Sequence, residues 1–157
     1  MEKHVNSESF SPSTHSVKGA IHWFSLSKPN ADITSLKVRP FIIIGRTNYN
    51  SKRVLLSPVQ DLANYMENGK VKYPYHVPLL MSKYDFLEKD SVILLDQVYT
   101  IAKEELFEEC YMGTICDFKP LDSAILYNFD LYESMMDEVA VLLSQYKTIY
   151  TNQFSRS

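Results

Sequence analysis

The side chains able to do chemistry are spread along this chain and are not gathered in a familiar catalytic motif. The four histidines, His4, His15, His22 and His76, are too dispersed to suggest a metal-ligand cluster, and neither H-E-x-x-H nor G-x-S-x-G occurs. The four glycines are too scattered to build a phosphate-binding loop. The sequence therefore leaves metal-free and cofactor-free chemistry based on Arg, Tyr, His, Lys, Thr or Ser, or no catalysis.

Several residues are of the types that bind single-stranded nucleic acid, because aromatic rings stack on bases and cationic or amide groups contact phosphates. The candidates that fall on predicted turns and short strands are Arg46, Asn48, Lys70, Lys72, Tyr73 and Tyr99. His76 in YPYHVPL is a further candidate, since an imidazole can exchange a proton near neutral pH. Surface exposure or packing in the sheet would equally explain each of them.

Charge is unevenly distributed along the chain. The formal net charge of −3 lacks the basic excess of a non-specific nucleic-acid binder. Residues 18–53 nevertheless carry seven Lys or Arg against one acid, Asp32, while acidic residues gather in the second half. This pattern predicts one basic and one acidic face, unless the charges only solvate the surface.

The 157 residues suit a single domain, and a polar segment precedes the apolar one along the chain. Residues 1–16 are rich in Ser, Asn and Thr without periodicity, which predicts a disordered polar arm. Residues 17–116 hold short apolar strands between turns, of which PFIIIG at 40–45 and SVILL at 91–95 are the clearest. Pro58 is expected to end the strand that starts at Arg53, and residues 102–108 favour a helix.

Residues 117–157 change to a helical pattern. The apolar residues that recur at helical spacing are Leu131, Met135, Val139, Leu142 and Tyr146. The pattern predicts a long amphipathic helix that packs on the strands. The fold class is therefore mainly β with α, an α+β protein made of a small barrel or twisted sheet and a long C-terminal helix.

The compartment is predicted from features that are missing. The sequence has no apolar run near the ~20 residues of a membrane helix, and its polar start does not resemble a secretory signal. Cys110 and Cys116 are interpreted as reduced thiols and not as a disulfide or zinc site. A cytoplasmic protein without membrane association or bound metal is expected.

Three segments in order carry a family resemblance: KGAIHWFSLSKP at 18–29, VRPFIIIGRTNYN at 38–50, and YPYHVPL at 73–79 followed by DSVILLDQVYTI at 90–101 and MGTI at 112–115. Together they resemble toxins of the MazF/PemK family. The resemblance implies an SH3-like barrel over residues 17–116, a homodimer, single-stranded RNA as substrate and a cognate antitoxin as partner. It also implies RNA cleavage by attack of the ribose 2′-hydroxyl on the neighbouring phosphate, without a metal.

The resemblance assigns catalytic positions. Arg39, directly before Pro40, matches the family's catalytic arginine, and its planar cation suits a crowded phosphorane. The family's catalytic threonine falls at Gln60, which can donate a hydrogen bond but cannot act as a nucleophile or base. Ser57 is a nearby hydroxyl that is a candidate substitute, and Tyr99 stands where the family often has arginine.

Two other functions stay open at this point. One is a catalytically inactive protein on the same fold that inhibits a host protein, as the related CcdB toxins inhibit DNA gyrase. The other is a degenerate member that only binds a partner. Both alternatives remain because Gln60 stands at the position of the family's catalytic threonine.

Overall fold

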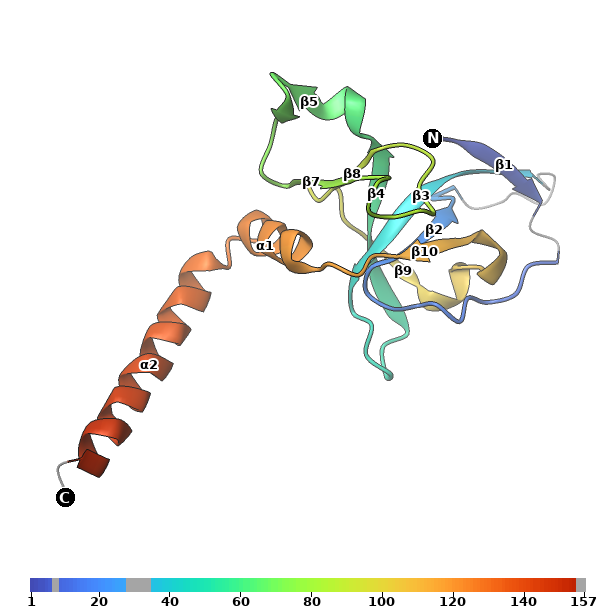
Figure 1. The fold of residues 1–157 in the computed structure, drawn as a ribbon. Coiled ribbons are helices and arrows are strands. Elements are labelled where there is room, and N and C mark those ends of the chain that lie inside the picture. Colours follow the sequence, from blue (N-terminus) through green and yellow to red (C-terminus); the bar gives the residue numbers. More distant parts are fainter. Residues whose placement is uncertain (7–8, 28–34, 155–157) are drawn as a thin grey trace.

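The chain folds into a curled antiparallel sheet followed by two helices (Figure 1). The structure is a computed structural model, and it describes residues 1–6, 9–27 and 35–154. The sheet order is β10-β2-β3-β4-β8-β7, with β1 on β3 and β9 on β4. The bounds are β1 Lys3–Asn6, β2 Ala20–Phe24, β3 Ser35–Gly45, β4 Arg53–Asp61, β7 His76–Leu79, β8 Ser91–Leu94, β9 Tyr99–Ala102 and β10 Tyr111–Thr114. The sheet curls into a half-barrel, and the predicted α+β class is confirmed.

The central strand β3 separates two apolar clusters. Side chains alternate along a strand, so Ile42 and Ile44 enter one cluster while Phe41 and Ile43 enter the other. All four are buried, which explains why the sequence of β3 is continuously apolar and not alternating. By the same alternation, Lys37 and Arg39 lie on the face of β3 that carries Phe41.

Strand β4 is longer than predicted, because Pro58 does not end it. Pro58 pairs with Phe41, and β4 continues to Asp61. On its other side β4 pairs with β9 up to Leu56 and with β8 from Val59 onward. On this side of β4, Pro58 thus lies between the end of the pairing with β9 and the start of the pairing with β8. Its missing N–H therefore removes no ladder hydrogen bond to either strand.

Two local predictions had different outcomes. Asn68 and Gly69 form the predicted turn, with φ values of 54° and 75°, between β5 (Met66–Glu67) and β6 (Lys70–Val71). The helix predicted over 102–108 is wrong, since only short 3-10 turns at Lys103–Glu105 and Glu108–Cys110 form there. A 3-10 helix, η1 (Leu62–Tyr65), follows β4.

The amino-terminal segment differs from the disordered arm that composition predicted. β1 pairs antiparallel with β3 from Lys3–Val38 to Asn6–Ser35. Further along, Glu108 accepts a hydrogen bond from the Thr14 backbone N–H at 2.7 Å, and the Ser13 hydroxyl lies 2.7 Å from His22 Nε2. Backbone pairing and hydrogen bonds attach this polar segment, and neither depends on the apolar periodicity that was missing from its sequence.

The two helices differ in their attachment. α1 (Lys119–Asn128) buries Leu121 and Ala124 against the sheet, and Asn128 donates a hydrogen bond to the Leu95 carbonyl at 2.7 Å. α2 (Tyr132–Phe154) is the predicted long helix, but it does not pack on the strands: it projects away from them (Figure 1), and every side chain from Tyr132 to Gln153 is exposed. Neither helix is long and apolar enough to cross a bilayer within the part of the chain that the structure describes.

Candidate functional site

A cleft of about 390 Å³ lies where β3, β4 and β9 share a face. Lys37, Arg39 and Phe41 alternate onto this face of β3, and β4 adds Pro58, which pairs with Phe41, and Gln60, two residues further along the strand. Tyr99 contributes from β9, opposite Leu56. We call this the Arg39 cleft. It brings together Arg39, Gln60 and Tyr99, three residues singled out in the sequence.

The Arg39 cleft has an aromatic floor and polar walls. Phe24 and Phe41 meet edge to face with centroids 5.8 Å apart, and Phe41 meets Tyr99 in the same way at 6.0 Å. Gln97 and the serines at 25 and 27 lie among the lining residues. An apolar floor beside cationic side chains is the combination that binds a nucleotide, because the base stacks while the phosphate meets charge.

A carboxylate near the amino terminus pairs with both cations of this cleft. Glu2 forms ion pairs with Arg39 and with Lys37, the latter at 2.8 Å. Hydrogen bonding to Lys37, with a further contribution from Arg39, lowers the pKa of Glu2, so the side chain stays ionised. The oxygens of Glu2 stand at a position where an anionic ligand would meet the same two cations.

Ser57 is not part of the cleft, which corrects its prediction as a catalytic residue. It faces the opposite side of β4 from Gln60, because the two residues are three positions apart on a strand. Its side chain is fully buried, and its hydroxyl has no hydrogen-bond partner among the described residues. A ligand in the Arg39 cleft cannot reach this hydroxyl.

A second hollow of about 430 Å³ adjoins the first through Tyr65, which lines both. Lys72, Tyr73 and His76 line it as well, so three more predicted residues are brought together. Tyr73 stacks on Tyr75 with centroids 5.2 Å apart, and the Lys72 ammonium lies 5.4 Å from the Tyr73 ring centre. We call this the Tyr73 hollow.

His76 sits at the base of the Tyr73 hollow with little exposure. Its ring is buried, with Nε2 3.7 Å from an Asp96 carboxylate oxygen and with Tyr65, Tyr73 and Tyr75 packed edge to face around it. Burial lowers the pKa of His76 although Asp96 opposes this shift. The imidazole is therefore neutral at pH 7 and is suited to hydrogen bonding more than to carrying charge.

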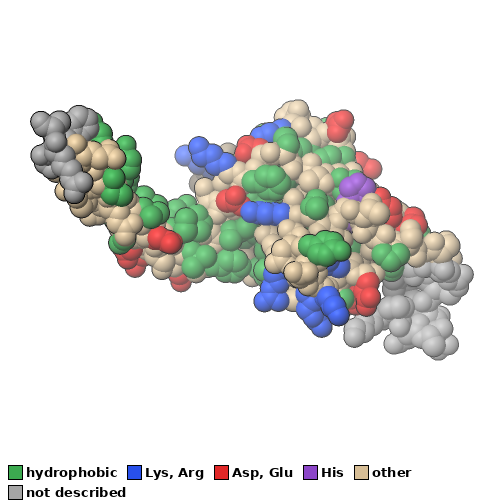
Figure 2. Space-filling model, turned by 90° about the horizontal axis from the view of Figure 1, so that it is seen from below, with side chains coloured by type: hydrophobic (Ala, Val, Ile, Leu, Met, Phe, Trp, Pro, Cys, Tyr) green, Lys and Arg blue, Asp and Glu red, His purple; other side chains and the backbone are tan. Residues whose placement is uncertain are grey.

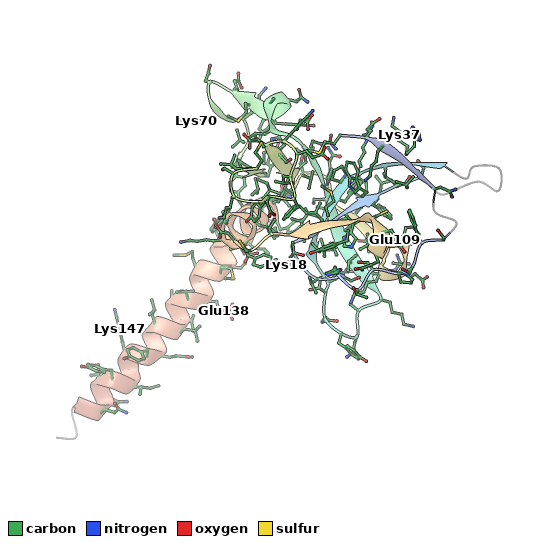
Figure 3. The ribbon with its side chains drawn as sticks, turned by 45° about the vertical axis from the view of Figure 1, so that its right-hand side comes forward. Lys18, Lys37, Lys70, Glu109, Glu138 and Lys147 are labelled. Atoms are coloured by element: carbon green, nitrogen blue, oxygen red, sulfur yellow. The ribbon has the colours of Figure 1, made fainter. Side chains whose placement is uncertain are left out.

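The remaining predicted residues lie elsewhere. Arg46 and Asn48 belong to the β3–β4 turn, at the opposite end of β3 from β1 and the Arg39 cleft (Figure 1). Lys70 lies at the small β5–β6 hairpin, well separated from Lys37 (Figure 3). Sequence reasoning missed Lys37 as a site residue, although its position two residues before Arg39 on a strand places both on one face.

Comparison with known proteins identifies the family. Residues 18–125 match the PemK-like, MazF-like toxins of type II toxin-antitoxin systems. The chain belongs to this family. It is 36% identical over 104 residues to "Endoribonuclease MazF" of Staphylococcus epidermidis, which covers 62% of this chain and 82% of that protein. The resemblance inferred from the three sequence segments is thus confirmed.

A solved structure supports the fold assignment. This chain is similar to an "Endoribonuclease in complex with its cognate antitoxin from Mycobacterial species", with a TM-score of 0.54 and 16% sequence identity. The likeness covers 73% of this chain and 95% of the other.

The family match bears directly on the site. It includes Arg39, Gln60 and Tyr99 of the cleft, whereas β1 and α2 lie outside it. Within the described residues, no group of three or more His, Cys, Asp or Glu side chains is placed to hold a metal ion.

Proposed function

We propose that this protein is the toxin of a toxin-antitoxin system and a metal-independent endoribonuclease that cuts single-stranded RNA at preferred sequences. The observation that carries the proposal is the convergence of Arg39 and Lys37 on an aromatic-floored cleft inside the family-matched segment. The 36% identical relative named as an endoribonuclease supports the same activity.

The chemistry follows from the charges in the Arg39 cleft. The ribose 2′-oxygen attacks the adjacent phosphorus while the bond from phosphorus to the 5′-oxygen breaks, which leaves a 2′,3′-cyclic phosphate and a 5′-hydroxyl. The Arg39 guanidinium stabilises the negative charge that accumulates on the phosphorane oxygens, and Lys37 adds a second cation. Gln60 orients the phosphate by donating a hydrogen bond, and because it has no titratable group, water accepts the 2′-hydroxyl proton. Arg39 or water supplies the proton that the leaving 5′-oxygen takes up.

The flanking nucleotides have matching surfaces. Tyr99 offers a ring for a base beside the scissile phosphate, with the buried Phe41 packed edge to face against it, and the adjoining Tyr73 hollow offers Tyr73 and Lys72 for a neighbouring nucleotide. A stacking surface split between two hollows favours a flexible single strand over a rigid duplex. The neutral His76 suits a hydrogen bond in this second hollow.

The expected partners are a second copy of the barrel and a cognate antitoxin. The mycobacterial endoribonuclease with a similar fold is described in complex with its antitoxin, which supports such a partner for this chain. An antitoxin that inserts an acidic group between Lys37 and Arg39 would meet the two cations that now pair with Glu2 and would block the cleft.

The test compares Arg39→Ala with a charge-matched control, Arg53→Ala, at the far end of β4. Purified proteins are incubated with a long single-stranded RNA in EDTA, and the cleavage rate and end groups are measured. Loss of one transition-state donor lowers the rate by roughly 10²–10³-fold for Arg39→Ala. Arg53→Ala keeps the wild-type rate. Absence of cleavage by folded wild-type protein, or equal rates for both variants, would refute the proposal.

A further inference from the structure

The helix α2 carries a broad apolar face that water contacts along its whole length. Its large apolar side chains are 43–65% exposed, and Figure 2 shows hydrophobic side chains along the projecting helix. They recur with the seven-residue repeat of a coiled coil on adjacent positions: Tyr132, Met135, Met136, Val139, Leu142, Leu143, Tyr146, Ile149 and Tyr150. The opposite side of α2 carries Asp137, Ser144 and Thr151. An exposed stripe of this size marks an interaction surface.

The family fold does not account for this surface. The family match ends at residue 125, and α2 begins at Tyr132. The preceding helix α1 already buries its own apolar residues, Leu121 and Ala124, against the sheet. A single helix exposed on all sides gains little from propensity alone, so α2 needs a packing partner of its own.

We propose that the partner is α2 of a second copy, paired antiparallel in a two-stranded coiled coil. In the register that aligns the core layers, each residue lies level with the residue of the second copy for which the two residue numbers add to 281. Each layer combines side chains of complementary size. The layers are Tyr132 with Ile149, Met135 with Tyr146, and Val139 with Leu142 of the second copy. The layer with the smaller side chains, Val139 and Leu142, lies at the centre, where the two helices cross most closely. The layers that contain one tyrosine each lie towards the ends. The face is thus complementary to itself, which a two-fold axis requires.

Charge selects the antiparallel orientation. Glu133 and Lys147 lie on one flank of the apolar face, 14 residues or two repeats apart. In the antiparallel register Lys147 stands level with Glu133 of the second copy, on both sides of the two-fold axis. Glu138 projects from the other side of the helix from Lys147 (Figure 3), and there it meets Gln145 of the second copy and no like charge. A parallel pair would instead set the acidic first turns of both helices side by side.

The shape of the chain allows this pairing. α2 has 23 residues, a length of about 35 Å, and its carboxyl end lies far from the sheet (Figure 1). Antiparallel helices therefore place the two half-barrels at opposite ends of the coiled coil, where they do not collide. The faces that carry the Arg39 clefts stay open, because α2 does not line them.

This contact is separate from a barrel-to-barrel dimer. If the barrels form a two-fold dimer, each dimer carries two α2 helices, and pairing both of them with the helices of a second dimer closes a tetramer. The expected readout is therefore a change of mass by a factor of two when the apolar face of α2 is disrupted.

The first test measures the mass of the full chain by light scattering during gel filtration. Leu142→Glu places a charge at the central layer and should halve the mass of the wild-type assembly. Ser144→Glu is the matched control, because the same charge two residues away points to the opposite side and should leave the mass unchanged. Equal masses for wild type and Leu142→Glu would overturn the proposal, as would a wild type that is monomeric at micromolar concentration.

The second test reads the orientation by cross-linking, with the exposed Cys116 replaced by Ser. Met135→Cys combined with Tyr146→Cys should give a disulfide-linked dimer under mild oxidation, because these residues share a layer. Tyr146→Cys alone should not, since the two copies of residue 146 lie about 16 Å apart along the antiparallel axis, beyond disulfide reach. Efficient cross-linking of the single variant would show a parallel pair and overturn the orientation.

Discussion

The two ends of this chain are attached in opposite ways. The amino-terminal arm, residues 1–16, is polar and short, yet strand β1 pairs with β3 and Glu108 holds Thr14 and His15 by hydrogen bonds. The carboxyl-terminal helix α2 is apolar and regular, yet it touches the sheet only at its start, where Tyr132 borders a hollow with Val77 of β7, and the described side chains after it stay exposed (Figure 1). A strand edge accepts almost any backbone, because its free N–H and C=O groups are the same for every residue type except proline. An apolar helix face binds only where a complementary surface exists.

The difference also divides the two ends by their relation to the Arg39 cleft. The arm pairs Glu2 with Lys37 and Arg39 of the cleft, whereas α2 extends away from it and meets, as we infer, a second copy. One end therefore contacts cleft residues of its own chain, and the other, by our proposal, contacts a second chain.

Replacing Leu121 gives the largest expected effect and sharpens the contrast between the two helices of the carboxyl-terminal region. Leu121 in α1 is fully buried, so Leu121→Ala should lower the free energy of unfolding by about 2–5 kcal/mol. Val141→Ala in α2, where the side chain is 56% exposed and off the proposed pairing face, should change it by less than about 0.5 kcal/mol. Urea denaturation followed by fluorescence measures both.

A large effect of Val141→Ala would contradict this contrast, because it would mean that α2 contributes to the stability of the folded domain. A small effect of Leu121→Ala would show that α1 is not the anchor of the carboxyl-terminal region.

Acid should weaken the fold where the arm meets the sheet. Burial, with the nearby His15 adding to it and Glu108 opposing it, lowers the pKa of His22 from 6.5 to about 4. Between these values the unfolded chain binds a proton that the folded chain does not, so stability is complete above pH 6.5 and falls as the pH drops towards 4. The loss is at most about 3 kcal/mol, since each pKa unit corresponds to about 1.4 kcal/mol.

The measurement is the free energy of unfolding in urea at several pH values between 7 and 4. His22→Gln should flatten the dependence on pH, whereas His4→Gln, on the exposed face of β1, should leave its slope as in the wild type. An equal slope in His22→Gln and wild type would show that other groups cause the loss. The part of the acid sensitivity that His22→Gln removes belongs to the arm end of the molecule, and His76, whose pKa burial also lowers, adds a loss of the same sign at the Tyr73 hollow.

Some of the architecture was predictable from local patterns and some was not. The apolar run at 40–45 and the Asn68-Gly69 turn predicted a strand and a hairpin, because both depend on neighbouring residues only. Alternation along β4 would also have shown that Gln60 and Ser57 cannot face the same cleft, an inference that depends on recognising that the strand continues past Pro58.

Long-range relations could not be predicted in this way. The contact between Glu2 and Arg39 joins residues 37 positions apart, and the pairing of β1 with β3 has no side-chain pattern. For α2 the helical period correctly predicted an apolar face, but a period says nothing about what covers that face.

Removing the Glu2 carboxylate is the smallest expected change and tests whether the arm restrains the proposed active site. Glu2→Gln should raise kcat/KM for RNA cleavage roughly three- to tenfold, because the phosphate no longer competes with a carboxylate for Lys37 and Arg39. Since the ion pairs are exposed to solvent, the gain should shrink as salt is added. Glu88→Gln, an equal charge change in the loop between β7 and β8, should leave the rate unaltered. Binding of a non-cleavable RNA with a 2′-deoxy scissile residue gives a second readout that does not require catalysis. If Glu2→Gln binds this RNA no more tightly than the wild type does, the arm does not occupy the position of the phosphate, whether or not the protein cuts RNA.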